Sequence, residues 1–315
     1  MIRVQDYNEG LKTVWDDFCN SSKTPMFMFN RNYMDYHSDR FYDSSLLFYD
    51  DDKLVGIFPA SISGNLLVSH GGLTYGGLIQ STSAKQERVI ECIDTLVEYC
   101  KSRDIDNVIY KFIPHIYHEV PSEEDVYAIS RLSYEIFKIE ASTVIDLENP
   151  LKMPKGRKAQ ISRARREGVE VKKCTDYLDF STFIDLENTV LNERHQTKAV
   201  HTAEELYLLY SRFPNNIHLY GGFINREMIS GVVLFEYNNA IHTQYMANSE
   251  LGRNIGGLDL IIKTIMDEFC CSKKWLDFGI STEKMGSVLN EGLISQKEGF
   301  GGRTNVYCTW RINIK

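Results

Sequence analysis

The sequence predicts an α+β protein with mixed sheets in which one supersecondary unit occurs twice. Residues 240–279 predict a strand, a glycine-rich turn, an amphipathic helix and a buried strand in direct succession. A similar order of elements occurs in the first half of the chain. The 315 residues, 43% of them hydrophobic, are enough for two domains of ordinary size. We therefore expect two domains, residues 1–150 and residues 151–315.

The segment 240–279 organises this prediction. Residues 240–248 alternate between two faces, as in a strand with distinct sides, and residues 251–257 hold an arginine and three glycines in a predicted turn. Apolar residues then recur at helical spacing: Leu258, Ile261, Ile262, Ile265, Met266 and Phe269. The unpaired N–H groups and positive dipole end of such a helix can hold a phosphate.

The internal repeat is visible in the hairpins and glycines. Residues 44–62 and residues 216–237 both predict a β-hairpin. Gly56 corresponds to Gly231, and Gly76-Gly77-Leu78 corresponds to Gly256-Gly257-Leu258 at nearly the same offset. A duplicated unit explains this order, while chance recurrence of a common motif is the alternative.

Composition excludes several classes of protein. The net charge of -8 argues against nucleic-acid or anionic-membrane binding by the whole surface. The start of the chain lacks the apolar core of a signal peptide, and no apolar run approaches the ~18 residues of a membrane span. Seven cysteines without CxxC spacing predict reduced thiols in a cytoplasmic protein that binds no metal.

A basic helix is predicted at the junction of the two domains, over residues 155–168, with Gly168 as its stop. The helix and the strand after it carry eight cations: Lys155, Arg157, Lys158, Arg163, Arg165, Arg166, Lys172 and Lys173. These residues form either a solvated face or a clamp for the phosphates of a nucleotide sugar, a lipid-linked pyrophosphate or tRNA. We expect Lys155 and Arg157 to face the cleft between the domains and bind substrate.

Three segments together resemble the Fem-type transferases, which add amino acids from aminoacyl-tRNA to peptidoglycan precursors. Residues 157–171 look like the family's basic helix and "GVEV" strand, and residues 187–195 resemble its helix ending in an arginine-containing turn. Residues 275–279 with residues 292–302 are similar to its "DFG…GL..FK..FG" ending. This resemblance implies two tandem GNAT-like acyltransferase domains.

One departure leaves the donor open. Many Fem enzymes carry a long helical coiled-coil insertion, and residues 180–215 contain no heptad stretch long enough for one. The chain therefore also resembles GNAT-like relatives of the Fem group that acylate amino sugars or other envelope precursors. The donor substrate is either acyl-CoA or aminoacyl-tRNA.

The residues Arg253, Asn254, Gly256 and Gly257 are the predicted donor-binding residues. Arg253-x-x-Gly256-Gly257-Leu258 resembles the pyrophosphate loop of GNAT enzymes, in which small residues let backbone donors approach the phosphates. Leu258 stands where that loop has Gly or Ala. A plain turn before a helix is the alternative.

Acyl transfer to an amine needs a deprotonated amine, a stabilised oxyanion and a protonated leaving group. The family resemblance places the oxyanion on backbone N–H groups of the strand 242–248. In or near this strand, His242, Tyr245 and Asp277 are the candidate catalytic residues, with core packing as the alternative. Lys297, in the segment that resembles the family's ending, is a fourth candidate, and a surface lysine is the alternative.

Four further residues are predicted to bind substrate. The resemblance places Arg194 and His195 in a turn that borders the active cleft. His70 and Tyr75 lie in a glycine-rich stretch of the first half and are predicted to contact the acceptor, unless that stretch is a structural turn.

The expected function is that of a cytoplasmic acyltransferase acting on an amine of a cell-envelope or polysaccharide precursor. The expected acceptor is a small-molecule amine or a lipid-linked amine. For a lipid-linked acceptor, we expect the protein to contact the membrane peripherally. One alternative is a Fem-type aminoacyltransferase with tRNA as its partner. The other is a non-catalytic module that binds a phosphorylated glycan precursor.

Overall fold

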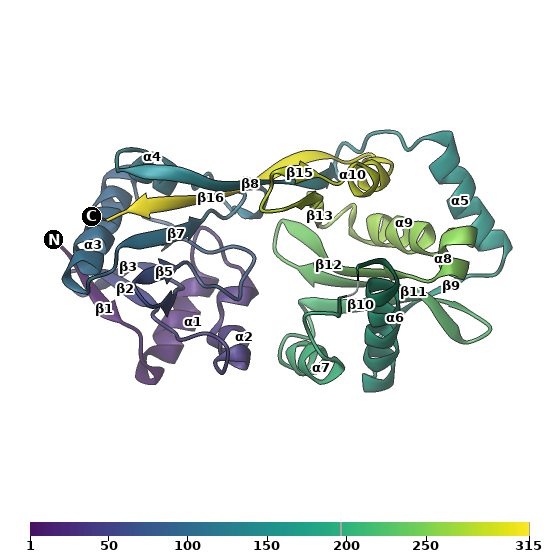
Figure 1. The fold of residues 1–315 in the computed structure, drawn as a ribbon, viewed down its shortest axis with the longest axis horizontal. Helices are drawn as coiled ribbons and strands as arrows, with labels where there is room; N and C mark the ends of the chain where they lie inside the picture. Colours follow the sequence, from purple (N-terminus) through teal and green to yellow (C-terminus); the bar gives the residue numbers. More distant parts are fainter. Residues whose placement is uncertain (196, 315) are drawn as a thin grey trace. The chain divides into compact units, whose positions relative to one another are not determined.

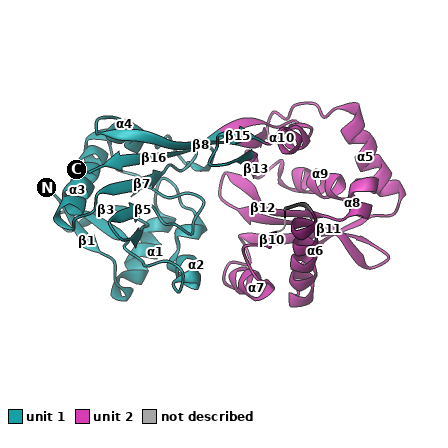
Figure 2. Cartoon of the chain, viewed as in Figure 1, with its two compact units in different colours: residues 1–141, 282–289, 306–315 teal, residues 142–281, 290–305 magenta. Residues whose placement is uncertain are grey.

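The computed structural model describes residues 1–195 and 197–314, without the side chains of Arg194 and His195. The chain forms two compact units (Figure 2). Unit 1 comprises residues 1–141, 282–289 and 306–315, and unit 2 comprises residues 142–281 and 290–305. Two segments of the second half thus belong to unit 1, whereas a single division at residue 150 assigns both to the second domain.

Unit 1 combines strands of three sheets with helices, and Figure 1 labels many of these elements. Its elements are β1 (Ile2–Asp6), α1 (Lys12–Asn20), α2 (Arg31–Met34), β2 (Leu46–Asp50), β3 (Lys53–Phe58), β4 (Ser61–Ser63), β5 (Leu66–Val68), β6 (Ile79–Gln80), α3 (Gln86–Ser102), β7 (Asn107–Lys111), α4 (Glu124–Ser130), most of β8 (Tyr134–Asp146), β14 (Thr282–Glu283), β15 (Val288–Leu289) and most of β16 (Arg303–Asn313). Four single 3-10 turns complete it: Glu9–Leu11, Phe27–Phe29, Asp35–His37 and His115–Tyr117. The order β1-β2-β3-β6 forms one antiparallel sheet.

Unit 2 is one sheet with helices on both faces. Its helices and strands are α5 (Lys155–Arg166), β9 (Glu170–Cys174), α6 (Tyr177–His195), α7 (Ala203–Arg212), β10 (Ile217–Ile224), β11 (Glu227–Glu236), β12 (Ala240–Asn248), α8 (Glu250–Ile255), α9 (Gly257–Phe269), β13 (Trp275–Ile280) and α10 (Glu291–Glu298). Residues 142–146 of β8 pair with β13, and the order continues as β12-β11-β10-β9. Among the described strands of unit 2, only β12 and β13 pair in parallel, because α8 and α9 connect them as a crossover.

The core of unit 2 lies between the sheet and α9. Val232, Leu234 and Ile241 point from one sheet face onto the apolar stripe of α9, which includes Ile261 and Ile265. These five side chains are almost fully buried. This packing fixes the position of α9 and of the residues at its start.

Helix α6 covers the opposite face of the sheet. A Cβ on Gly231 would lie 2.5 Å from the Phe183 ring, so the helix approaches the strand closely only because residue 231 is a glycine. Gly231 pairs with Ala247 of β12, and the next residue on that face of β12 is Tyr245. Residues 245 and 247 therefore face α6.

Two irregularities open the middle of the sheet. The paired register of β12 with β13 ends at His242 and Asp277, so residues 243–248 of β12 continue past the last bond to β13. The register of β12 on β11 also shifts: Val233 pairs with Tyr245 while Leu234 pairs with Thr243, which makes residue 244 a bulge. Backbone groups on this part of β12 consequently face the space beside it.

Most predicted elements are confirmed. Both hairpins, the strand 240–248, the helix after it, the strand 275–279 and the basic helix lie where the patterns place them. Gly76-Gly77-Leu78, however, lies in irregular structure before β6, and the helix of that unit begins only at Gln86. The two Gly-Gly-Leu segments therefore do not share a local structure, although the order of hairpin, helix and strand recurs.

The predicted turn at 251–257 is wrong, because residues 250–255 form helix α8. Ser249 initiates this helix by accepting a hydrogen bond from Gly252 N at 3.0 Å. Gly256, with φ of 85°, ends α8 and is followed directly by α9. The turn is thus one residue long.

Candidate functional site

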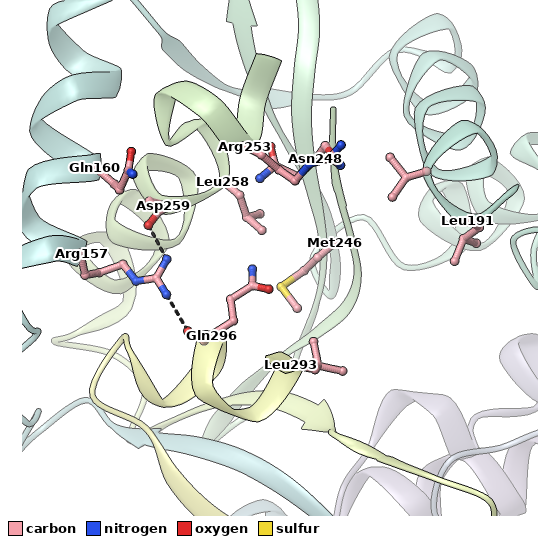
Figure 3. A pocket seen from close by; sticks show the side chains of 11 residues that line it. Arg157, Gln160, Leu191, Met246, Asn248, Arg253, Leu258, Asp259, Leu293 and Gln296 are labelled. Atoms are coloured by element: carbon pink, nitrogen blue, oxygen red, sulfur yellow. Dashed lines mark hydrogen bonds and ion pairs between the residues drawn. The ribbon is translucent and has the colours of Figure 1, made fainter. Parts of the chain in front are cut away.

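A pocket of about 430 Å³ lies within unit 2, beside the outer half of β12 (Figure 3). Five structural elements contribute its walls: α5, α6, β12, the α8–α9 junction and α10. The lining residues are Arg157, Gln160, Val190, Leu191, Met246, Asn248, Arg253, Leu258, Asp259, Leu293 and Gln296. Met246 and Asn248 follow the point where β12 leaves β13, so the pocket lies where the sheet opens.

The pocket is amphipathic. Its apolar side chains come from α6, β12, α9 and α10, and its polar side chains come mainly from α5 and the α8–α9 junction. In Figure 3, Arg157 and Gln160 lie across the pocket from Leu191. The arrangement suits a ligand with an apolar part and an anionic part.

Arg157 is fixed by three contacts. Its guanidinium pairs with the Asp259 carboxylate and donates to Gln296 O at 2.8 Å. The group also lies over the Phe300 ring, 4.1 Å from the centroid. These contacts join α5 to α9 and α10, so the arginine holds the pocket together and contributes positive charge to it.

Arg253 is the second pocket cation. Its Nη1 donates to Asn248 O at 2.7 Å, which links α8 to the end of β12. The first turn of α9, residues 257–259, follows with no side chain capping it. Arg253 and this helix start provide a positive region, offset in part by Asp259 in the same turn.

Packing explains the glycines of this segment. A Cβ on Gly252 would lie 2.5 Å from Ile229 O, one on Gly256 would lie 2.6 Å from Gln160 O, and one on Gly257 would lie 2.6 Å from Ser230 Oγ. The amides of Arg253 and Gly256 bond to Ser249 O and Gly252 O inside α8. The glycines thus bring α8 and α9 close to α5 and β11, and the Asn254 side chain is exposed.

A buried polar cluster surrounds Asp277. The carboxylate is fully buried and lies 3.1 Å from His242 Nδ1 through Oδ2. Its Oδ1 accepts hydrogen bonds from Ser142 Oγ at 2.5 Å and Gly279 N at 2.9 Å. The sheet places His242 and Asp277 opposite one another on β12 and β13. This pairing orients the imidazole.

Lys297 belongs to the same region. It lies on α10, is 3% exposed, and donates from Nζ to Gly279 O at 2.9 Å and Ile280 O at 2.6 Å. Burial lowers the Lys297 pKa to about 8, and the Asp277 charge opposes this shift. The neighbouring Gln296 lines the pocket, so α10 presents one side chain to the pocket and the next to the Asp277 region.

Tyr245 forms a separate pair. Its hydroxyl bonds to Nδ1 of His201, a residue that the sequence patterns do not single out. His201 precedes α7, and the nearby Ala199 N donates to Asn188 Oδ1 at 2.9 Å. This bond attaches the segment before α7 to α6.

The predicted site residues are thus distributed over several places. The pocket brings together Arg157 and Arg253, and His242, Asp277 and Lys297 meet next to it. Lys155 is exposed at the start of α5. The side chains of Arg194 and His195 lie outside the described part of the structure.

His70 and Tyr75 are both buried in unit 1, so their predicted contact with acceptor stays a prediction. Burial lowers the pKa of His70 to about 3. Tyr75 Oη lies 2.9 Å from Tyr117 Oη and 2.8 Å from Tyr307 Oη. These two contacts hold the Tyr75 hydroxyl inside unit 1.

Sequence reasoning missed Glu187, a buried carboxyl on α6. The signal was present: the apolar stripe of α6 runs through Phe180, Phe183, Ile184, Val190 and Leu191, and Glu187 occupies the same stripe. Gln160 and Met246 were also missed, because only the fold brings α5 and the end of β12 together.

Across residues 1–195 and 197–314, no group of three or more His, Cys, Asp or Glu side chains is placed to hold a metal ion. In the same part of the chain, the helices are too short or too polar for any of them to cross a bilayer.

Solved structures share this fold. The crystal structure of FemX matches with a TM-score of 0.67 and 11% identity, over 97% of this chain and 96% of that one. The C-terminal domain of a putative lysylphosphatidylglycerol synthetase from Agrobacterium fabrum matches with a TM-score of 0.63 and 10% identity, over 96% of this chain and 92% of that one. A tandem GNAT protein from the clavulanic acid biosynthesis pathway matches with a TM-score of 0.54 and 10% identity, over 100% of this chain and 99% of that one.

These likenesses concern the fold. They confirm the predicted class, an α+β protein with two tandem GNAT-like domains, and the resemblance to Fem-type and GNAT-type proteins at that level. No protein-family model matches the chain. No curated protein matches it either.

Proposed function

We propose that the chain is an acyltransferase that moves an acyl group from acyl-CoA to an amine of a cell-envelope or polysaccharide precursor. The observation that carries this proposal is the pocket at the opening between β12 and β13, with Arg157 and Arg253 in its wall. The class of acceptor rests on the sequence resemblance to Fem-type transferases. The fold shared with a tandem GNAT protein supports acyl transfer as the reaction.

The charge and polarity of the pocket wall support this choice of donor substrate. Arg253 and the uncapped start of α9 suit an anionic phosphate of the donor. The apolar side chains Leu191, Met246 and Leu293 suit the thioester arm. The carbonyl group then lies along residues 243–248 of β12, where the N–H groups that point away from β11 are beyond the register with β13 and can serve as oxyanion donors.

The reaction has two proton transfers: the amine nitrogen loses a proton to a base, and the departing sulfur gains a proton. The amine nitrogen attacks the carbonyl carbon, the C–N bond forms, and the C–S bond breaks with its electron pair going to sulfur. Lys297 and His242, the second held by Asp277, are the groups that supply a proton on the leaving-group side. The products are an amide and a free thiol.

Isothermal titration with acetyl-CoA tests the donor. We expect Arg253→Ala to weaken binding about tenfold, because one charge-assisted contact is lost. Arg131→Ala, an exposed arginine at the end of α4, serves as the control and should bind like the wild type. Absence of heat from the wild-type protein at millimolar ligand would reject acyl-CoA as donor.

A second candidate function is aminoacyl transfer from aminoacyl-tRNA. It is favoured by the exposed face of α5, where Lys158, Arg163, Arg165 and Arg166 point to solvent beside the pocket residues of the same helix. Phosphate contacts through these residues would make tRNA retention steeply salt-dependent. Retention at low salt that is lost in Arg163→Ala/Arg166→Ala would favour this candidate, and no retention at low salt would exclude it.

A further inference from the structure

Glu187 interrupts the apolar stripe of α6. The stripe faces the sheet with Phe183 and Ile184 one turn before Glu187, and with Val190 and Leu191 one turn after it. Phe183 packs on Gly231, and Val190 and Leu191 line the pocket. The Glu187 carboxyl therefore lies between a helix–sheet contact and the pocket wall.

This carboxyl is buried, and its Oε2 has no hydrogen-bond partner among the described residues. Glu187 is 7% exposed. The buried carboxylates of Asp259 and Asp277 do have partners, Arg157 for the first and Ser142 for the second. Among the described residues, burial is the one cause that raises the Glu187 pKa to about 7.

An unpartnered buried carboxyl costs stability, and such groups are concentrated at functional sites. A carboxylate can accept from an ammonium group, which is the form of a basic primary amine near neutral pH. The acceptor of the proposed function is such an amine. Helix α6 thus places a proton acceptor beside the pocket in which the donor is expected.

We propose that Glu187 is the catalytic base that takes the proton from the acceptor amine, an inference that rests on the proposed acyl transfer. The ammonium gives one proton to the Glu187 carboxylate, and the freed lone pair forms the C–N bond. When the C–S bond breaks, the thiolate takes up the second proton of the nitrogen. Lys297 and His242, next to Asp277, relay this proton. Glu187 then releases its proton to solvent.

Helices α6 and α10 hold opposite roles in this scheme. Val190 and Leu191 of α6 and Leu293 and Gln296 of α10 wall the same pocket. The base Glu187 lies one turn before the first pair on α6, and the acid Lys297 directly follows Gln296 on α10. Burial brings the pKa of both groups close to neutral pH, where a catalytic base and a catalytic acid work best.

The test compares Glu187→Gln with Asp185→Asn, an exposed acidic position on the same helix. Acetyl-CoA is the donor, and glucosamine and lysine-containing peptides are the acceptors. We expect Glu187→Gln to bind acetyl-CoA like the wild type and to lose about 100-fold in kcat/KM. Hydroxylamine, which is neutral at pH 7, needs no base and should be acylated by both proteins within a few-fold. Asp185→Asn should behave like the wild type.

Other results decide against the inference. Equal kcat/KM for both proteins with glucosamine or the peptides, or loss of acetyl-CoA binding in Glu187→Gln, would show that the carboxyl is not the base. If the wild type turns over no acceptor, the ¹³C resonance of the Glu187 carboxyl decides: it should shift when glucosamine or the peptides are added, and an unchanged signal would overturn the site. Failure of acetyl-CoA to bind rejects the proposed function and leaves this carboxyl measurement intact.

Discussion

His242 Nδ1 lies 3.1 Å from Asp277 Oδ2, across the last paired position of β12 and β13. Because an ionised carboxylate only accepts hydrogen bonds, Nδ1 is the donor, and Nε2 is the basic nitrogen of the neutral ring. Asp277 in turn is held by Ser142 Oγ and Gly279 N. The orientation of the imidazole therefore depends on a carboxylate whose other oxygen is also fully engaged.

Replacing this carboxylate tests the dependence. Asp277→Asn presents an amide group to three donors, so we expect a loss of about 2 kcal/mol in unfolding free energy and a change in the His242 tautomer. Urea unfolding measures the first and ¹⁵N NMR of the imidazole measures the second. Ser142→Ala removes only one of the donors and should cost about 1 kcal/mol. An unchanged tautomer in Asp277→Asn would show that Asp277 does not orient the ring.

The pair of Arg157 and Asp259 predicts a strong coupling. Arg157→Ala leaves the largely buried Asp259 carboxylate unpaired, and we expect this to cost about 2 kcal/mol. The double variant Arg157→Ala/Asp259→Ala should recover part of that loss, and Arg157→Lys should recover little because lysine lacks the planar fork. Additive losses in urea unfolding would mean that the ion pair contributes nothing to α5–α9 packing.

Local patterns were sufficient for most of unit 2. The alternation in β12 and the spacing of Ile261 and Ile265 in α9 predicted both elements, because each buries one defined face. The basic helix ended as predicted, since Gly168 adopts φ of 81°. The prediction of a turn over residues 251–257 was wrong, because residues 250–255 form α8. The glycines of residues 251–257 satisfy contacts with α5 and β11, and such contacts are fixed by the fold rather than by neighbours in the chain.

The site was predicted only in part for the same reason. His242 and Asp277 were selected by residue type, while their pairing depends on the parallel register of two strands. Residue type alone left open whether Lys297 is exposed, and tertiary packing buries it against Gly279 O. Glu187 was missed because a charged residue on a helix is usually solvated, and only the covering sheet shows that this one is not.

Three glycines allow backbone strain to be separated from steric clash. Gly256→Ala places a Cβ 2.6 Å from Gln160 O at φ of 85°, and should cost about 3 kcal/mol. Gly168→Ala has φ of 81° and open space, and should cost about 1 kcal/mol. Gly156→Ala, in open space within α5, should be neutral or stabilising. Equal losses at positions 256 and 168 in thermal unfolding would remove the clash from the explanation.

The pH dependence of kcat/KM follows from two groups. Glu187 must be ionised, so activity should rise as pH increases through about 7, and Lys297 must be protonated, so activity should fall through about 8. Glu187→Gln should remove the acidic limb, and Lys297→Ala should remove the alkaline limb, each with reduced activity between them. A profile that keeps both limbs in both variants would assign the titrating groups elsewhere.

Asp125 predicts how the stability of unit 1 depends on pH. Burial raises the pKa of this carboxyl to about 7, and Tyr110 Oη donates to it at 2.7 Å. In the unfolded chain an aspartate has a pKa of about 3.9. Between this pKa and the folded-state pKa of Asp125, the carboxyl is protonated in the folded state and ionised in the unfolded state. The stabilisation is complete below about pH 4 and is lost as pH rises through about 7.

Asp125→Asn should remove this dependence, because the amide oxygen still accepts from Tyr110 and carries no proton to lose. We expect wild-type unfolding free energy to fall by about 2 kcal/mol more than that of Asp125→Asn between pH 5 and pH 8, measured by urea unfolding. Asp94→Asn, an exposed position on α3, should keep the wild-type slope. Parallel slopes in the wild type and Asp125→Asn would mean that Asp125 is already ionised at pH 5, in which case Tyr110 and its neighbours stabilise the charge rather than the proton.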